Sequence, residues 1–371
     1  MDGEPDGRLL AGWRDLAEAA ETANVFAGPE MFLAARGRIA PEDWVPVPVE
    51  GPGGRLDAIA AVRRTRTAPL VGPRVVDLYW SHYGPRGCPL IRAGVPDAAD
   101  RLLDALAARG PVLRLPYAAL CTGAVHALVG AAERRGGAAI VVDEHERARL
   151  DVAAGAAALG PGLVGRRRRE LDRQWRKLAE GGPLSTWTST GHAALAGLDA
   201  FVALEHKGWK GRVRTSLASD PRRVDFARAF LEPLAAADRV RVDRLDRAGE
   251  PIAVLITLFS GDTGFLWKIA YDERFAHGSP GVQLVRRASE ALVARPGLAG
   301  VDSLAVADHS LMDRSWAGRM RIGTLFLALG PAALTAARRA AAAETAVIAL
   351  RTRARTIRGL VRQRLRLAPG P

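Results

Sequence analysis

The chain has only two cysteines, Cys88 and Cys121, among its 371 residues. Two thiols cannot build a disulfide framework, and a cysteine-poor chain is typical of a reducing compartment. Long apolar runs are also missing, because no uncharged stretch reaches the length of about 18 residues that a membrane-spanning helix needs. The first seven residues are acidic and lack the apolar core of a signal peptide. We therefore expect a cytoplasmic protein.

Sequence motifs for covalent or metal catalysis are absent as well. No Gly-x-Ser-x-Gly motif is present, the pattern that places a nucleophilic serine on a strand-to-helix turn. The seven histidines show no ligand spacing with one another or with cysteine, so the sequence predicts no metal site. Cys88 precedes a proline and Cys121 opens an apolar segment, and both positions are typical of packing residues. The chemistry that we expect needs neither a metal nor a catalytic cysteine.

Acidic residues are scarce at the C-terminal end. Residues 331–371 contain nine arginines and the single acid Glu344, and so carry +8 of the formal net charge of +13. In the rest of the chain the numbers of basic and acidic residues are nearly equal, which argues against general nucleic-acid binding by the body. Hydrophobic residues make up 48% and charged residues 25%, as in a globular protein long enough for two domains.

The second half of the chain alternates short strands and helices. We expect strands at 184–190, 239–247, 251–260, 265–271, 301–306 and 322–329, and helices at 193–207, 223–237, 281–295 and 310–318. The first half repeats part of this order. Its expected helices are 29–38, 96–109 and 119–135, and its strands are 44–49, 56–63, 75–79, 112–115 and 138–142. Two similar units predict a mixed α+β fold made by duplication.

We place the first domain at residues 1–163 and the second at 184–330. Residues 164–183 form a basic linker helix that carries four consecutive arginines, and residues 331–371 form a basic helical tail. The arginines of the linker either form a solvated face or lie beside an anionic cofactor or acceptor. The sequence leaves both interpretations open.

The segment 264–285 is the most informative part of the chain. It predicts a strand, a turn through Gly278, and a helix that opens at Ser279 and Pro280, because serine is a preferred N-cap and proline suits the first helical position. Free N–H groups at such a turn, with the helix dipole behind them, bind anions. The pattern suggests a phosphate-bearing cofactor, but taken alone it is explained better by a tight strand-to-helix turn that needs Gly278 and Gly281.

The element order of the second half, with this turn between its fourth strand and third helix, resembles the GNAT acyltransferase fold. Three segments are similar to its FemAB-like, CelD-type branch, which has tandem GNAT units in envelope and exopolysaccharide contexts. They are Glu205–Arg212, Trp267–Gly281 and Val301–His309, with residues 24–30 and 83–90 in the first half. The resemblance spans residues 13–329. It implies tandem domains, each a mostly antiparallel splayed sheet flanked by helices, of which the first is degenerate.

The resemblance also implies an acyl-CoA donor, in particular acetyl-CoA, with its pantetheine arm between the fourth and fifth strands. The donor-binding candidates are Tyr271, Arg274, Gly278, Ser279, Gly281 and Val282. The chain departs from the family turn Gln/Arg-x-x-Gly-x-Gly/Ala, and Pro280 removes one N–H donor. FemAB relatives that take an aminoacyl group from tRNA have also altered this region, so aminoacyl-tRNA is the alternative donor.

In GNAT-type transfer an amine or hydroxyl attacks the thioester directly and a base accepts its proton. Asp308 and His309 follow the fifth strand and form a carboxylate–imidazole pair suited to proton transfer near neutral pH. Alternatively, Asp308 caps the short helix that follows. Lys268, on a mostly apolar strand, is the third catalytic candidate. It either pairs with a carboxylate such as Asp302 or Asp308, or binds an anionic substrate.

The candidates for substrate binding are Lys207, Trp209, Lys210, Trp267 and Asp272. Trp209 and its two neighbouring lysines either form an aromatic and cationic wall for a sugar or phosphate, or Trp209 packs in the core. We expect an acyltransferase for a polar envelope-type acceptor, such as an amino sugar or a polysaccharide precursor. A catalytically idle GNAT-fold binding protein at the membrane is the alternative from another class.

In the tail, helical spacing stacks one apolar stripe with arginines on both sides. The stripe consists of Val347, Leu350, Ala354, Ile357, Val361 and Leu365. Such a helix is suited to the anionic inner face of a membrane, where its arginines snorkel. Ile348, Leu360 and Leu367 lie off the stripe, which instead favours a helix packed on the body. Nucleic acid, including tRNA, is a third and lesser possibility for the tail.

Overall fold

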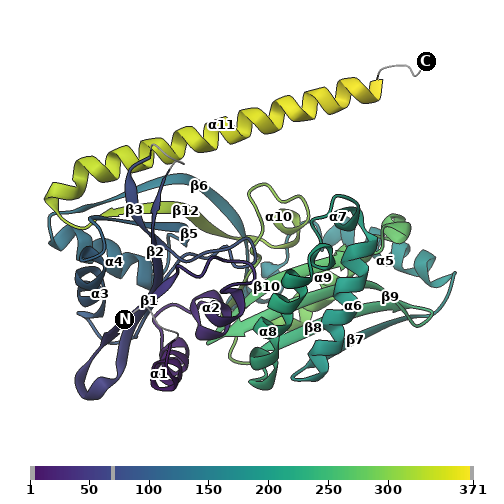
Figure 1. Ribbon diagram of the computed structural model, residues 1–371. Coiled ribbons are helices and arrows are strands. Elements are labelled where there is room, and N and C mark those ends of the chain that lie inside the picture. The colour runs from purple at the N-terminus through teal and green to yellow at the C-terminus, as the bar shows by residue number, and fades with distance from the viewer. Residues whose placement is uncertain (1–4, 68–71, 368–371) are drawn as a thin grey trace.

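The first half of the chain forms a group of strands flanked by helices (Figure 1). The computed structural model describes residues 5–67 and 72–367, and their side chains as far as residue 354. The strands of this half are β1 (Val45–Glu50), β2 (Leu56–Arg66), β3 (Arg74–Leu78), β4 (Leu90–Ile91), β5 (Val112–Ala119) and β6 (Ala138–Asp151). Its helices are α1 (Gly7–Glu18), α2 (Pro29–Ala35), α3 (Ala98–Ala107) and α4 (Gly123–Arg134).

The linker helix α5 (Gly165–Ala179) leads into the second half. The strands there are β7 (Leu184–Thr190), β8 (Val240–Arg247), β9 (Glu250–Ser260), β10 (Thr263–Tyr271), β11 (Gly300–Asp302) and β12 (Gly318–Ala328). The helices are α6 (Ala193–Lys207), α7 (Trp209–Arg212), α8 (Pro221–Ala236), α9 (Pro280–Val293), α10 (Met312–Ser315) and the long C-terminal α11 (Leu334–Leu367). This order agrees with the predicted β-α-α-β-β-β-α-β-α-β, apart from the short α7.

The twelve strands of the described residues join one sheet in the order β1-β2-β3-β5-β12-β6-β11-β10-β9-β8-β7, with β4 paired to β2. Two neighbouring pairs are parallel, β3 with β5 and β10 with β11. The other pairs are antiparallel. The predicted mixed α+β fold, with mostly antiparallel strands, flanking helices and a C-terminal helix, is confirmed.

The two halves exchange strands at the middle of this sheet. β12, from the end of the second half, lies between β5 and β6, so that Phe326 is opposite Arg114 on one side and Ile140 on the other. β6, from the end of the first half, continues past β12 and pairs with β11, where Arg149 is opposite Asp302. Each half therefore contributes a strand to the sheet of the other. The halves follow one another in the sequence, but main-chain hydrogen bonds join their strands into one sheet.

Helices cover both faces of the sheet. In the second half, α6 and α8 pack on one face and α9 packs on the other, in two separate apolar clusters. The cluster under α6 and α8 also contains Trp13 and Phe32 from α1 and α2, so the two halves share this core. In the first half, α3 and α4 cover one face and the start of α11 covers the other.

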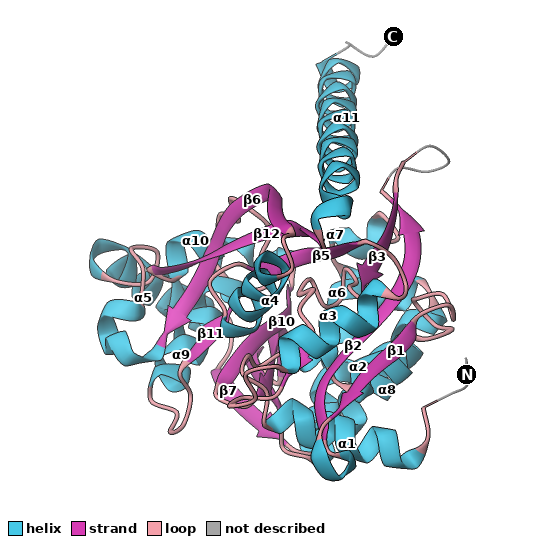
Figure 2. Cartoon of the chain, turned by 90° about the vertical axis from the view of Figure 1, so that its left-hand side faces the viewer, coloured by secondary structure: helices cyan, strands magenta, loops and turns pink. Residues whose placement is uncertain are grey.

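The start of α11 is anchored to the body. Ala337, Ala340 and Ala341 are buried against β3, β5 and β12, and Arg114 donates to Glu344 at 2.9 Å. After Glu344 the helix projects from the body (Figure 2), and Leu350 is 64% exposed. The remainder of the predicted stripe, Ile357, Val361 and Leu365, lies outside the described side chains. No helix in the described part of the chain is long and apolar enough to cross a membrane.

Several predicted boundaries were wrong. The strand predicted at 138–142 runs to Asp151, because it pairs first with β12 and then with β11. The strand predicted at 301–306 ends at Asp302, and Leu304 has a φ of 51°, which is outside strand conformation. The helix predicted at 119–135 begins only at Gly123, because residues 112–119 form β5. Helix α1 was not predicted.

Candidate active site

The parallel strands β10 and β11 pair over only three positions, the last of which joins Phe265 to Asp302. Beyond this point β11 ends, while β10 continues to Tyr271 and pairs there, among the residues that the structure describes, with β9 alone. We call residues 268–271 the outer end of β10. Main-chain groups that lack a neighbouring strand are available to a ligand. The first half repeats this divergence, because β3 and β5 pair over only two positions.

A β-bulge in β10 decides which side chains face this opening. The register shifts between Leu266 and Lys268, so that Trp267 is the extra residue. Leu266 joins the apolar cluster under α9, whereas Trp267 joins the cluster under α6 and α8. Lys268 is opposite Ile256, which belongs to the same α6 and α8 cluster. Trp267 and Lys268 therefore lie on the same face, and the alternation expected from the sequence is interrupted.

Lys268 is enclosed by aromatic rings. Its Nζ lies 4.6 Å from the ring centroid of Tyr83 and 5.7 Å from that of Trp267. Tyr83 belongs to the first half and is fixed there, because Trp267 Nε1 donates to its carbonyl oxygen at 2.6 Å. Burial, with a smaller contribution from Lys210, lowers the pKa of Lys268 to about 8, and Glu205 opposes this shift. Sequence reasoning did not find Tyr83, since no local pattern links residues so far apart.

Neither Asp302 nor Asp308 forms an ion pair with Lys268 within the described residues. Asp302 is fully buried and accepts from Arg86 at 2.6 Å and from Arg147 at 2.5 Å. Arg86 comes from the loop before β4 and Arg147 from β6, so three distant segments meet where β10 and β11 diverge. Within the described residues Lys268 forms no ion pair with any carboxylate. Of the two alternatives for Lys268, the pairing with Asp302 or Asp308 is therefore not found in the described residues.

Asp308 and His309 lie in the turn after β11. Asp308 is exposed, with a φ of 55°, and its side chain makes no hydrogen bond within the described residues. His309 is half-buried, and its Nδ1 accepts from the N–H of Met312 at 3.3 Å. The alternative in which Asp308 caps the short helix is not found, since His309 makes that contact. The carboxylate of Asp308 therefore remains available to a substrate.

The turn before α9 differs from the predicted glycine-rich turn. Residues Glu273–Gly278 form a 3-10 helix, and Ser279 follows with a φ of 53° and no side-chain capping hydrogen bond. A Cβ on Gly278 would lie 2.3 Å from Leu178 of the linker helix, so this glycine permits α5 to pack on the turn. Gly281 lies under the ring of Tyr271, where a Cβ would be 3.4 Å from Cδ1.

The start of α9 has the features of an anion site. The N–H groups of Gly281 and Val282 have no hydrogen-bond acceptor in the described residues, and the first turn contains no acid. Helix α3 occupies the equivalent place in the first half, between β3 and β5. It follows Asp97 and carries Asp100 in its first turn, and both acids pair with arginines, Asp97 with Arg101 at 2.8 Å and Asp100 with Arg135 at 2.5 Å. The first turn of α9 has no such acid.

A groove lies beside the outer end of β10. It has a volume of about 330 Å³ and is lined by Leu204, Lys207, Gly208, Arg212, Asp272, Glu273 and Arg274. An adjoining hollow is lined by Glu205, Trp209, Lys210 and residues 269–271. Trp209 is 55% exposed, so its alternative role in the core is wrong. Of the donor-binding candidates, Tyr271 lines the hollow and Arg274 lines the groove, where it pairs with Asp272 at 2.6 Å.

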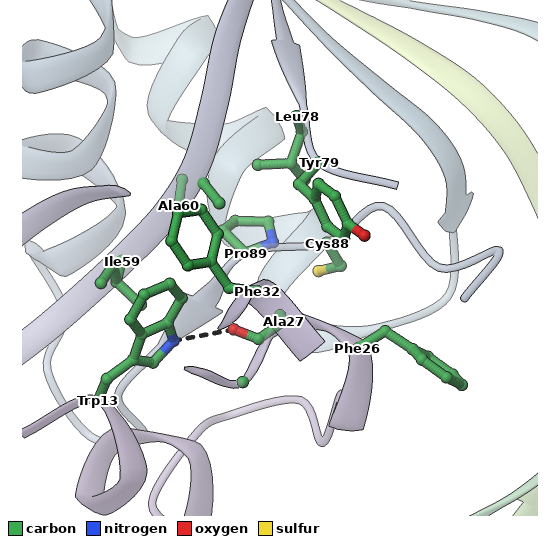
Figure 3. Close-up of a pocket in the computed structure, with 12 residues that line it drawn as sticks. Trp13, Phe26, Ala27, Phe32, Ile59, Ala60, Leu78, Tyr79, Cys88 and Pro89 are labelled. Carbon is green, nitrogen blue, oxygen red and sulfur yellow. Dashed lines mark hydrogen bonds between the residues drawn. The ribbon is translucent and has the colours of Figure 1, made fainter. Parts of the chain in front are cut away.

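The first half has an apolar crevice near its own diverging strands (Figure 3). Side chains from α1, α2 and β2 line it, together with Tyr79 and Cys88, and Trp13 Nε1 donates to the carbonyl of Ala27 at 2.8 Å. Its volume of about 10 Å³ is roughly that of one water molecule, and no charged side chain lines it. Burial raises the pKa values of Tyr79 and Cys88. The basic groove of the second half has no counterpart in this crevice.

Comparison with known families supports the assignment of the second half. Residues 165–310 match the model of the acetyltransferase (GNAT) domain. The match extends from α5 past His309 and includes Lys268, the turn before α9 and the basic groove. The second half is therefore similar to a GNAT acetyltransferase domain. No curated protein matches the chain.

Three solved structures are similar to the chain over nearly its whole length. FemX has a TM-score of 0.57 at 10% identity and covers 87% of this chain and 96% of its own. The C-terminal domain of a putative lysylphosphatidylglycerol synthetase from Agrobacterium fabrum scores 0.54 at 12% identity, with coverage of 89% and 94%. L-PGS from Bacillus licheniformis scores 0.52 at 11% identity, with coverage of 92% and 97%. At such identities the similarity shows the fold alone.

Proposed function

We propose that this protein is an acyltransferase that moves an acyl group, in particular acetyl, from acyl-CoA to an amine or hydroxyl of a polar acceptor. The start of α9 supports this proposal most directly. The free N–H groups of Gly281 and Val282 suit the pyrophosphate of the donor, and they belong to a domain that matches the GNAT family. The divergence of β10 from β11 provides main-chain groups beside which a pantetheine arm can lie.

The transfer proceeds by direct attack. The lone pair of the acceptor forms a bond to the acyl carbon, the carbon–sulfur bond breaks, and the sulfur leaves with the electron pair and takes up a proton. The acceptor loses one proton in the same process. Asp308, His309 and Lys268 are the candidates for these proton transfers. Asp308 is exposed, and Lys268 has no carboxylate partner among the described residues, so both remain available to reactants.

The acceptor that we propose is of the envelope type, such as an amino sugar or a polysaccharide precursor. The exposed ring of Trp209 and the basic side chains of the groove support a polar, ring-shaped acceptor. We further propose that the protein is cytoplasmic and attaches through α11 to the inner face of the membrane, next to a lipid-linked acceptor. The arginines of the tail support this location.

A second candidate function is transfer of an aminoacyl group from tRNA. Two observations favour it. FemX and both lysylphosphatidylglycerol-type structures cover about nine-tenths of this chain, although the similarity shows the fold alone. In addition, α5 packs on the turn before α9 and exposes Arg166, Arg169, Arg173 and Arg176 there. Such a basic surface suits the phosphates of an RNA.

Titration with donors separates the two candidates. Acetyl-CoA or a longer acyl-CoA is expected to bind the protein in calorimetry, and Gly281→Asp is expected to abolish binding, because a carboxylate would repel the pyrophosphate and crowd Tyr271. Gly7→Asp is the matched control, since a Cβ at Gly7 meets no atom within 4 Å and lies far from the site in sequence. Binding of charged tRNA without binding of any CoA species would contradict the first candidate and support the second.

Asp308→Asn and His309→Ala are expected to lower kcat by about 100-fold or more, the usual contribution of a general acid or base. The Kd for the donor is expected to stay unchanged, because neither side chain lies at the start of α9. His126→Ala, an exposed change on α4, is the control. Steady-state kinetics and donor titration measure both effects. If thermal unfolding shifts while kcat does not, these residues have only a structural role.

A further inference from the structure

Lysine is rare in this chain, and its positions are uneven. Of 53 lysines and arginines, only Lys177, Lys207, Lys210 and Lys268 are lysines. Three of these four lie around the outer end of β10: Lys268 on the strand, and Lys207 and Lys210 beside it in the groove and the hollow. Lysine and arginine are not interchangeable, because the ammonium is a compact charge that can lose its proton when buried. Three of the four lysines therefore lie in one part of the fold.

The carboxylates around the groove are already paired. The pairs are Glu205–Lys210 at 2.8 Å, Glu273–Arg212 at 2.6 Å and Asp272–Arg274 at 2.6 Å. Within the described residues Lys207 and Lys268 take part in no ion pair, so the region keeps a surplus of positive charge. Lys207 is exposed at the rim, whereas Lys268 is partly buried between rings, where an unmatched charge is costly.

Glu205 attracts Lys268 through its charge but forms no ion pair with it. Its Oε1 accepts from Lys210, and its Oε2 accepts from the N–H of Leu217 at 2.8 Å. Tyr83 and Trp267 offer Lys268 only the faces of their rings. An anion from a ligand would satisfy Lys268 better than any group of the described chain.

This location separates the lysines from the donor pyrophosphate site. Lys268 lies on the sheet face covered by α6 and α8, and Lys207 and Lys210 belong to α6 and α7. The start of α9 lies on the opposite face. An anion at Lys268 would therefore lie on the other sheet face from one at Gly281, and Tyr271 borders both Gly281 and the hollow that Lys210 lines.

We propose that Lys207, Lys210 and Lys268, together with Tyr83, form a subsite that binds a carboxylate or phosphate group of the acceptor. This inference rests on the proposed function and assigns an anionic acceptor to it. Because Tyr83 comes from the first half, this subsite of the second half is complete only when both halves are present. The first half then contributes to acceptor binding without binding a donor itself.

The scarcity of lysine makes a direct test practical. Reductive methylation with [¹³C]formaldehyde labels the four lysines and the N-terminal amine, and the variants Lys207→Arg, Lys210→Arg and Lys268→Arg assign the signals. Inorganic phosphate or acetate is expected to raise the titration midpoint of Lys268 by about one pH unit, as an anion within hydrogen-bonding reach does. Sodium chloride at equal ionic strength is the reference. The readout needs no turnover, so it is independent of whether the protein proves to be an acyltransferase.

Lys177 on α5 and the variants of Tyr83 serve as controls. Lys177 is expected to respond to phosphate no more than to sodium chloride. Tyr83→Phe is expected to keep the response of Lys268, and Tyr83→Ala to weaken it, because only alanine removes the ring over Nζ. Equal responses of Lys268 and Lys177 would overturn the subsite. A response of Lys268 to CoA that disappears in Gly281→Asp would assign the anion to the donor and overturn the acceptor assignment.

Discussion

Replacing Asp302 by asparagine is expected to lower the free energy of unfolding by about 3–5 kcal/mol, the usual effect of removing one partner from a buried ion pair. The carboxylate of Asp302 is fully buried between the guanidinium groups of Arg86 and Arg147, which are themselves almost fully buried. Without it, two like charges would remain in the interior. Denaturant-induced unfolding measures the loss.

Asp199→Asn is the matched control, since it removes the carboxylate from the exposed pair of Asp199 with Arg228. Exposed pairs contribute about 1 kcal/mol or less. If both variants unfold at the same denaturant concentration, the buried cluster does not stabilise the fold.

The same cluster predicts a pH dependence. Burial raises the pKa of Asp302, but Arg147 and Arg86 lower it more strongly, so that it lies below the usual value of about 3.9. A carboxylate with a depressed pKa contributes stability that is present above its unfolded-state pKa and is lost as the pH falls through the folded-state value. The difference in stability between the natural protein and Asp302→Asn is therefore expected to shrink in acid below about pH 4.

Removing residues 346–371 is expected to abolish binding to anionic vesicles and to leave the body folded. The segment contains seven arginines and no acid. Each arginine near an anionic surface contributes about 1 kcal/mol, and the attraction weakens with salt. The deletion starts beyond Glu344, because Ala340 and Ala341 are buried and Glu344 pairs with Arg114. Vesicle flotation at low and high salt measures the binding.

A full-length variant in which these seven arginines are replaced by lysine is the control, since it keeps the charge and is expected to float. Vesicles of neutral lipid are expected to bind neither protein. The membrane proposal fails if the full-length protein ignores anionic vesicles at low salt, or if it binds neutral and anionic vesicles equally.

Local patterns predicted the elements of the second half well. Helix α6 has the predicted bounds, and β9, β10 and α9 each begin and end within two residues of the prediction. Their signals are local, because apolar periodicity and the Ser-Pro sequence at a helix start depend only on neighbouring residues. The resemblance to the GNAT family rests on these same elements, and the match of residues 165–310 supports it.

The site could be predicted only in part, because its charged residues pair with residues that are far away in the sequence. Lys268 was a candidate from the sequence. No residue next to it in the sequence indicates that Asp302 pairs with Arg86 and Arg147. The bulge at Trp267 also lacks a local signal, since it depends on the register with β9. Tyr83 reaches the site from a loop of the other half. Such contacts follow from the exchanged strands and not from periodicity.

The exchange of β6 and β12 also sets an order for folding during synthesis. Strand β5 is made about 200 residues before β12, which at ribosomal rates is a delay of roughly 10–40 s. During that time the edge of β5 that faces β12 in the finished protein has no partner, and an open edge invites pairing with other chains. The first half therefore emerges from the ribosome incomplete and acquires its last strand only when residues 318–328 arrive. Until then the nascent chain carries an unpaired strand edge, the feature that makes folding intermediates prone to aggregation.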